Sequence, residues 1–112
     1  MSIAERRCET RFLCAELVRV KWLNQETDAI LEDISPYGAC VQVEQAIELE
    51  TPITLTIGRT SFPGRVTYSV FRDYGHFVGM RFAAETCWSA ETVIPQHLIS
   101  LYEIAHGPEP HI

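Results

Sequence analysis

The strongest constraint on the fold is a two-residue alternation of apolar and polar side chains, which recurs in short runs separated by turn-forming residues. In the first run, Val18, Val20 and Trp22 alternate with Arg19 and Lys21. A period of two residues is typical of a β-strand with one buried face, whereas an amphipathic helix repeats about every 3.6 residues. The chain is therefore expected to consist mainly of strands.

The alternation continues through most of the chain. Further strands are predicted at residues 29–31, 39–43, 53–57, 65–71 and 76–82. Their connections are polar or contain glycine or proline, at residues 24–28, 33–38, 45–52 and 72–75. Five or six short strands with turns between them favour a sandwich or barrel of antiparallel strands.

Two of these strands contain features that bear on their packing. In the strand over residues 65–71, the alternation places Val66, Tyr68 and Val70 on one face. Gly79 lies inside the following strand. A glycine weakens a strand interior and usually marks a bulge or a close approach of backbone or ligand.

The end of the chain has a different period. From residue 94 the apolar side chains follow a helical repeat, at Ile94, Leu98, Leu101, Tyr102 and Ala105. The Gly107-Pro108 pair then supplies a stop. The expected organisation is a mobile N-terminal arm over residues 1–11, a barrel with a C-terminal helix over residues 12–106, and a tail over residues 107–112.

Length and charge exclude several classes of function. A chain of 112 residues is one domain, and its formal net charge of −6 opposes bulk attraction to DNA, RNA or an anionic membrane. No apolar run approaches the roughly 20 residues that span a bilayer, so we expect no membrane insertion and a cytoplasmic location. The charged N-terminus carries three of the nine basic residues within its first eleven positions.

Neither a catalytic nor a metal site is predicted. The sequence contains no nucleophile elbow, phosphate-binding loop, dinucleotide fingerprint or zinc-protease motif. The four cysteines have no metal-binding spacing and are expected to be reduced thiols: Cys8, Cys14, Cys40 and Cys87. We therefore expect a binding protein, with no enzymatic activity and no cofactor.

Two polar motifs together could bind a ligand. Arg7 and Arg11 are four residues apart, a spacing that puts both on one side of either a strand or a helix. Their planar forks suit phosphate oxygens or the O6 and N7 acceptors of guanine, each bidentate pair contributing roughly 1–3 kcal/mol of discrimination. Asp33, Ser35 and Gly38 form a turn whose carboxylate would accept hydrogen bonds from guanine N1 and N2. Turn formation alone also explains these three residues.

These motifs carry a resemblance to a known family. The order and separation of RxxxR at Arg7 and Arg11 and DxSxxG at Asp33, Ser35 and Gly38 resemble the PilZ domain, the bacterial receptor module for cyclic di-GMP. Residues 64–68 and 78–82 are similar to later strands of that family, and the resemblance extends from Arg6 to the C-terminal helix. It implies an all-β fold, a six-stranded antiparallel β-barrel of PilZ type with a C-terminal α-helix.

The resemblance also implies roles for individual residues. Arg7 and Arg11 would contact guanine and phosphate, Asp33 and Ser35 would contact a guanine, and Gly38 would shape the turn.

Two neighbouring positions bear on how the ligand binds. Arg6, directly before the motif, resembles the doubled arginine of members that bind a stacked pair of ligand molecules. Tyr37 stands where the family often has a small residue, and we expect it to be a partly exposed turn tyrosine.

Three functions remain in competition. The first is a cyclic di-GMP receptor that relays the signal to an unidentified downstream protein, with an arm that closes on the ligand. The second is a PilZ-like protein-interaction module in pilus or motility assemblies that does not bind nucleotide. Members of that kind typically lack the arginine motif, which is present here. The third is an RNA-binding barrel, which would need exposed aromatic residues on a basic face.

Overall fold

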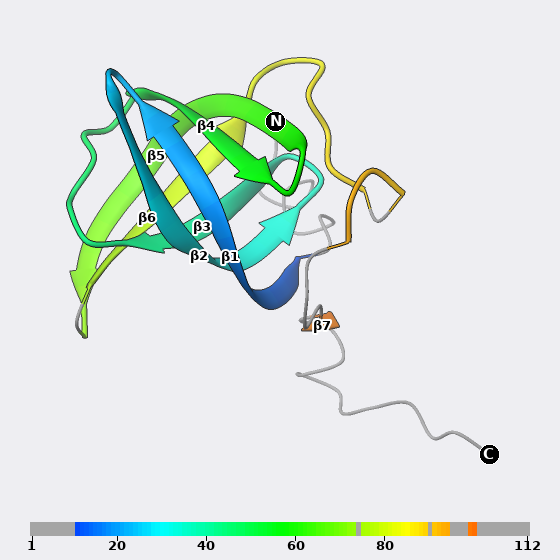
Figure 1. Cartoon of the computed structure of the whole chain (residues 1–112), viewed down its shortest axis with the longest axis horizontal. Coiled ribbons are helices and arrows are strands. Elements are labelled where there is room, and N and C mark those ends of the chain that lie inside the picture. The colour runs from blue at the N-terminus through cyan, green and yellow to red at the C-terminus, as the bar shows by residue number, and fades with distance from the viewer. Residues whose placement is uncertain (1–10, 74, 90, 95–98, 101–112) are drawn as a thin grey trace, which may run out of the picture.

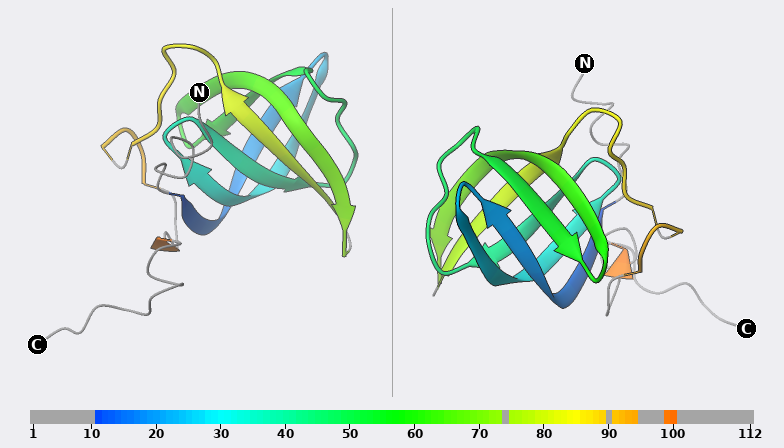
Figure 2. Two further views of the ribbon diagram at one scale, coloured as in Figure 1. Left: turned by 180° about the vertical axis from the view of Figure 1, so that it is seen from behind. Right: turned by 45° about the horizontal axis from the view of Figure 1, so that its top comes forward.

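The computed structural model describes residues 11–73, 75–89, 91–94 and 99–100. Its strands are β1 (Phe12–Trp22), β2 (Gln25–Ser35), β3 (Gly38–Val43), β4 (Pro52–Ile57), β5 (Thr60–Arg72), β6 (Gly75–Phe82) and β7 (Ile99–Ser100). The first six pair antiparallel in the order β2-β3-β6-β5-β4-β1, and β1 also pairs with β2. These pairings close a barrel, as Figures 1 and 2 show. The predicted all-β fold with a six-stranded antiparallel barrel is confirmed.

Inward-pointing side chains from every barrel strand form one apolar core. Each of the six strands contributes a side chain with no exposed surface: Val20, Leu31, Val41, Leu55, Val66 and Val78. Phe62 and Phe82 stack within this core, with ring centroids 5.1 Å apart. Full burial of one such side chain contributes roughly 1.5–3 kcal/mol, so the core supplies the main driving force for closing the barrel.

The first hairpin is longer than the sequence pattern indicates. Residues 24–28 were expected to be a turn, but β2 begins at Gln25 and pairs with β1 from Trp22 onward. The strand extends because its backbone continues the antiparallel ladder with β1, and its polar side chains lie on the outer face of the hairpin. Arg19 makes ion pairs of 2.8 Å with both Glu26 and Asp28. Polar composition was therefore a misleading turn signal here.

The strand expected at residues 65–71 is also longer, and its outer half changes face. β5 runs from Thr60 to Arg72, and an extra residue, Thr67, is inserted where Val66 pairs with Met80 and Tyr68 pairs with Gly79. Because this bulge shifts the alternation by one, Val66 is buried while Tyr68 is 41% exposed. The prediction that these two residues share a face is therefore wrong. Val70 is also exposed, so it does not share the buried face of Val66 either. The bulge or close approach predicted at Gly79 is confirmed.

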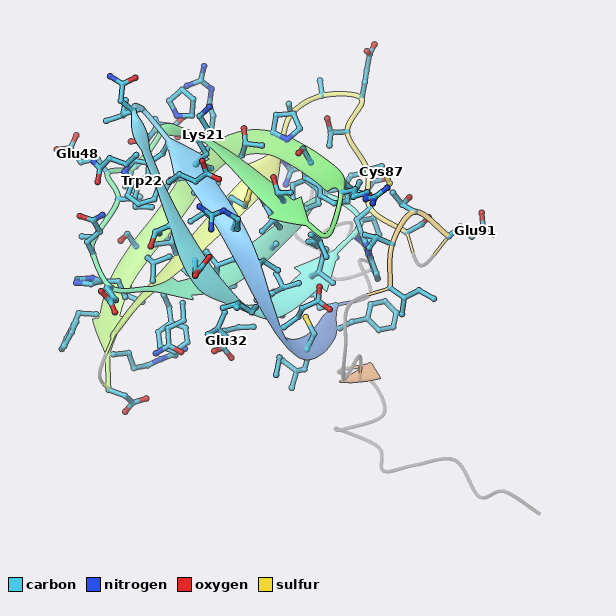
Figure 3. The ribbon with its side chains drawn as sticks, viewed as in Figure 1. Lys21, Trp22, Glu32, Glu48, Cys87 and Glu91 are labelled. Atoms are coloured by element: carbon cyan, nitrogen blue, oxygen red, sulfur yellow. The ribbon has the colours of Figure 1, made fainter. Side chains whose placement is uncertain are left out.

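A loop after β6 covers one end of the barrel. Trp88 is 2% exposed and packs edge-to-face against Phe12, with ring centroids 5.5 Å apart. Its indole Nε1 donates a hydrogen bond to the Val93 carbonyl at 2.9 Å. Figure 3 shows Cys87 and Glu91 on this loop, at the opposite end of the barrel from Lys21 and Trp22. We call residues 83–89 and 91–94 the end loop.

The predicted C-terminal helix falls largely outside the described residues. Ile99–Ser100 form the two-residue strand β7, which pairs with Phe12 and Leu13 of β1. Residues 95–98 and 101–112 are not described, so the helix remains a prediction, as do the arm and the tail. In the described part of the chain, no helix has the length and apolar character needed to cross a bilayer.

Candidate functional site

A β-bulge turns the side chain of Asp33, the first residue of the DxSxxG motif, toward the outer face of the barrel. Leu31 is buried in the core, and strict alternation would also point Asp33 inward. Glu32 is an extra residue in β2, because Leu31 pairs with Val41 while Asp33 pairs with Cys40. This shift moves Asp33 to the outer face, where 15% of its side chain is exposed.

Two rows of register partners organise the outer face around Asp33. The site row crosses β2, β3, β6 and β5 through Asp33, Cys40, Gly79 and Tyr68. The neighbouring arginine row crosses the same strands through Ser35, Gly38, Arg81 and Arg65. Residues far apart in the sequence therefore lie next to one another, and both polar residues of the predicted turn belong to this surface.

The prediction of a turn over residues 33–38 is too long, because β2 continues to Ser35 and β3 begins at Gly38, which leaves Pro36 and Tyr37 as the turn. This turn and the strand ends beside it are held from several directions. Ser35 Oγ donates a hydrogen bond to the Gly38 carbonyl at 3.3 Å. The backbone N–H groups of Phe82 and Trp88 donate to the carbonyls of Tyr37 and Pro36, at 2.8 Å and 2.9 Å. Because the turn is bonded to β6 and to the end loop, its geometry is fixed by the barrel.

Gly38 is required by backbone packing. A Cβ at this position would come within 2.5 Å of the Met80 carbonyl oxygen, which belongs to the backbone of β6. The glycines with positive φ do not include Gly38. Glycine therefore permits close contact between the backbones of β3 and β6. This contact fixes the position of Gly38 at the end of the motif.

Arg11 is the described arginine of the RxxxR motif, and it contacts the turn directly. Its Nη2 atom lies 2.7 Å from Asp33 Oδ1, with 48% of the arginine side chain exposed. The hydrogen bond to Asp33 raises the pKa of Arg11 above its ordinary value. Arg11 was expected to belong to a mobile arm, yet here it is paired with Asp33. Arg6 and Arg7 lie outside the described residues, so their predicted roles are untested.

Tyr68 adds an aromatic surface beside this ion pair. Its ring occupies the space left by Gly79, since a Cβ there would overlap ring atoms of Tyr68. Cys40, which pairs with Gly79 in the site row, is only 4% exposed but does not belong to the apolar core. Burial and the neighbouring Cys40 thiol raise the pKa of Tyr68, which keeps its hydroxyl protonated at neutral pH. The ring therefore covers the row and presents a flat surface next to Arg11.

These residues surround a depression of about 470 Å³, which we call the site depression. Of the predicted site residues it contains Arg11, Asp33, Ser35 and Gly38. The exposed Tyr37 also lines it, as expected for a turn tyrosine. Its size is comparable to that of small-molecule sites, which commonly enclose roughly 300–1,000 Å³.

Five further lining residues were not predicted as site residues: Ala39, Thr67, Tyr68, Met80 and Arg81. Thr67 and Tyr68 reach the depression through the β5 bulge, whereas the alternation had placed Tyr68 on the same face as Val66. The unusual glycine in β6 was the available signal, because it leaves room for a ring on the neighbouring strand. Arg81 carried no comparable signal in the sequence.

The pKa values of several acidic and thiol groups near the site are raised. Burial, followed by the Asp33 carboxylate, raises the pKa of Glu32. Burial raises the pKa of the Cys14 thiol to about 12 and also raises that of Cys40, so both stay protonated and are poor nucleophiles. Within the described ranges, no group of three or more His, Cys, Asp or Glu side chains is arranged to hold a metal ion.

Comparison with known proteins identifies the family. A search of curated proteins finds no match to this chain. The family model for the PilZ domain matches residues 5–87, a span that contains both sequence motifs and the six barrel strands. PilZ is a binding-domain family without a catalytic reaction of its own, in agreement with the depression of basic, acidic and aromatic groups described above. The chain therefore belongs to the PilZ domain family.

Proposed function

We propose that this protein is a receptor for cyclic di-GMP that passes the signal to a protein partner. The observation that carries the proposal is the Arg11–Asp33 pair at the edge of the site depression. Residues that are 22 positions apart in the chain place an arginine fork and a carboxylate side by side. Guanine has acceptors at O6 and N7 and donors at N1 and N2, so this arrangement is complementary to one base.

The ion pair need not break completely for the ligand to bind. Only Oδ1 of Asp33 and Nη2 of Arg11 are joined at 2.7 Å. An ionised carboxylate has about four acceptor positions and a guanidinium has five N–H donors, so each group retains capacity for a base or phosphate. Exposed ion pairs contribute only about 0–1 kcal/mol, so rearranging this one is inexpensive relative to new charge-assisted hydrogen bonds.

Tyr68 supports the same ligand class. Its exposed ring lies beside Arg11 and Asp33 and lines the same depression. Stacking of a base on an aromatic ring contributes roughly 1–3 kcal/mol in nucleotide-binding proteins. A guanine could thus be held at its edge by the ion pair and at its face by Tyr68. The predicted contacts of Arg6 and Arg7 would add phosphate neutralisation.

Calorimetric titration with cyclic di-GMP tests the proposal. We expect a dissociation constant below tens of micromolar, which corresponds to about −6 kcal/mol or better. Arg11→Ala and Asp33→Ala should each weaken binding by at least about tenfold, because each removes a charge-assisted contact. A linear guanine dinucleotide serves as the specificity control.

The β1–β2 hairpin offers a matched control pair. Arg19 and Asp28 form an ion pair of similar length, 2.8 Å, and neither lines the site depression. Arg19→Ala and Asp28→Ala should leave affinity within about twofold. If the wild-type protein shows no binding at tens of micromolar, the receptor proposal is wrong and the interaction module without nucleotide binding becomes the better explanation.

A further inference from the structure

A second basic group lies in the arginine row, next to the predicted turn. Arg65 of β5 and Arg81 of β6 are direct register partners, and Arg81 is in turn the partner of Gly38. Both side chains are exposed on the outer face, since the adjacent Val66 and Phe82 are buried. Directly opposed residues in antiparallel strands have Cβ atoms roughly 4.5–5.5 Å apart. The two guanidinium groups can therefore reach one anion.

In the described part of the chain, neither arginine of this pair forms an ion pair with a carboxylate. Arg11 and Arg19 each lie within 2.8 Å of a carboxylate, whereas no described carboxylate makes an ion pair with Arg65 or Arg81. Arg65 Nη1 donates to the backbone carbonyl of Glu50 at 2.9 Å, which orients its guanidinium without cancelling the charge. Like charges directly opposite one another destabilise a sheet. Binding of an anion would relieve this repulsion.

The pair also borders a recess of its own. A second depression, of about 500 Å³, is lined by Arg65 and Arg81 and shares Arg81 and Thr67 with the site depression. Glu50 lines it as well, so one acidic residue borders the same space. Arg81 thus stands between the two depressions, within reach of a ligand that occupies either.

We propose that Arg65 and Arg81 form a phosphate-binding subsite that extends the DxSxxG site along the outer face of the barrel. Its ligand class is a phosphate or phosphodiester anion, held by charge-assisted hydrogen bonds from both arginines. Insofar as that phosphate belongs to cyclic di-GMP, the inference rests on the proposed function. A free phosphate anion has the same chemistry, and the experiment distinguishes the two sources.

The test is calorimetric titration of Arg65→Gln and Arg81→Gln, with Arg59→Gln as the matched control. Arg59 lies in the β4–β5 turn, lines neither depression, and changes the net charge equally. Cyclic di-GMP and inorganic pyrophosphate are titrated separately. We expect either subsite variant to weaken binding by about tenfold, and Arg59→Gln by less than about twofold. Glu50→Gln should tighten binding, because it removes the opposing charge.

The outcomes separate the two proposals. If the wild-type protein binds cyclic di-GMP and all three arginine variants weaken this binding equally, the subsite proposal is overturned. The receptor function then remains intact. If cyclic di-GMP does not bind but pyrophosphate does, and only the subsite variants lose it, the subsite stands as a site for free phosphate. Absence of binding to both ligands overturns the subsite, as would a lowered melting temperature in both subsite variants or no gain of affinity in Glu50→Gln.

Discussion

Gly79→Ala is expected to displace Tyr68 from the surface of the barrel. The added Cβ would overlap the Tyr68 ring, and that ring can move because it is 41% exposed. A tyrosine buries about 200 Å² when fully covered, so the covered part here is about 120 Å², which contributes about 3 kcal/mol at most. The displaced ring remains partly buried, and alanine is favoured over glycine in a strand by up to about 1 kcal/mol. We therefore expect the free energy of unfolding to fall by about 1–2 kcal/mol.

A double-mutant cycle in urea isolates this effect. In a Tyr68→Ala background the space over residue 79 is empty, so Gly79→Ala should be neutral or stabilise the protein by up to about 1 kcal/mol. The interaction energy between the two positions should then be about 2 kcal/mol. The same Gly79→Ala variant should bind cyclic di-GMP more weakly, because the displaced ring no longer provides a fixed surface. Additivity of the two substitutions to within about 0.5 kcal/mol would refute the packing argument.

Three further predictions follow from the surroundings of the site. Trp88→Ala should lower the free energy of unfolding by about 3–5 kcal/mol in urea titration, because it opens the covered end of the barrel; a loss below about 1 kcal/mol would contradict its role there. Glu32→Gln should raise the melting temperature at neutral pH, and the gain should disappear at acidic pH. A raised folded-state pKa means that ionisation of Glu32 opposes folding as pH rises above its unfolded pKa, so a gain that persists in acid would contradict this cause. In mass-spectrometric mapping with iodoacetamide, the exposed Cys87 should react before Cys14 and Cys40, and equal rates would show that those two are not protected by burial.

Alternation alone was sufficient to predict most of the strands, whereas the choice of a barrel over a sandwich depended on the resemblance to the PilZ family. Runs such as that ending at Trp22 have one strictly buried face, and that face is a property of the local sequence. Strand ends were less predictable. Gln25 and its neighbours resemble a turn in composition, but their backbone continues the antiparallel ladder with β1, and Arg19 on that strand pairs with the carboxylates of Glu26 and Asp28.

The residues that line the site were only partly predictable, because β-bulges decide which side chains face outward. A bulge is an extra residue relative to a partner strand, so neither Glu32 nor Thr67 is marked as one within its own strand. Asp33 of the motif lines the site depression, whereas Tyr68 was wrongly assigned to the same face as the buried Val66. Trp88 has no periodic pattern around it, and its position at the end of the barrel depends on tertiary contacts that a single sequence does not display.

The hydrogen bond from the Trp88 backbone to the Pro36 carbonyl has a consequence for signalling. It joins the ligand turn to the end loop, so the conformations of the two segments are thermodynamically linked. Any partner that binds the end loop and alters this bond changes the affinity of the turn for its ligand, and the ligand changes the affinity for that partner by the same factor. A coupling of 10-fold requires only about 1.4 kcal/mol, which is within the range of one buried hydrogen bond. For the receptor function proposed above, the path from nucleotide to partner would therefore be as short as one peptide group.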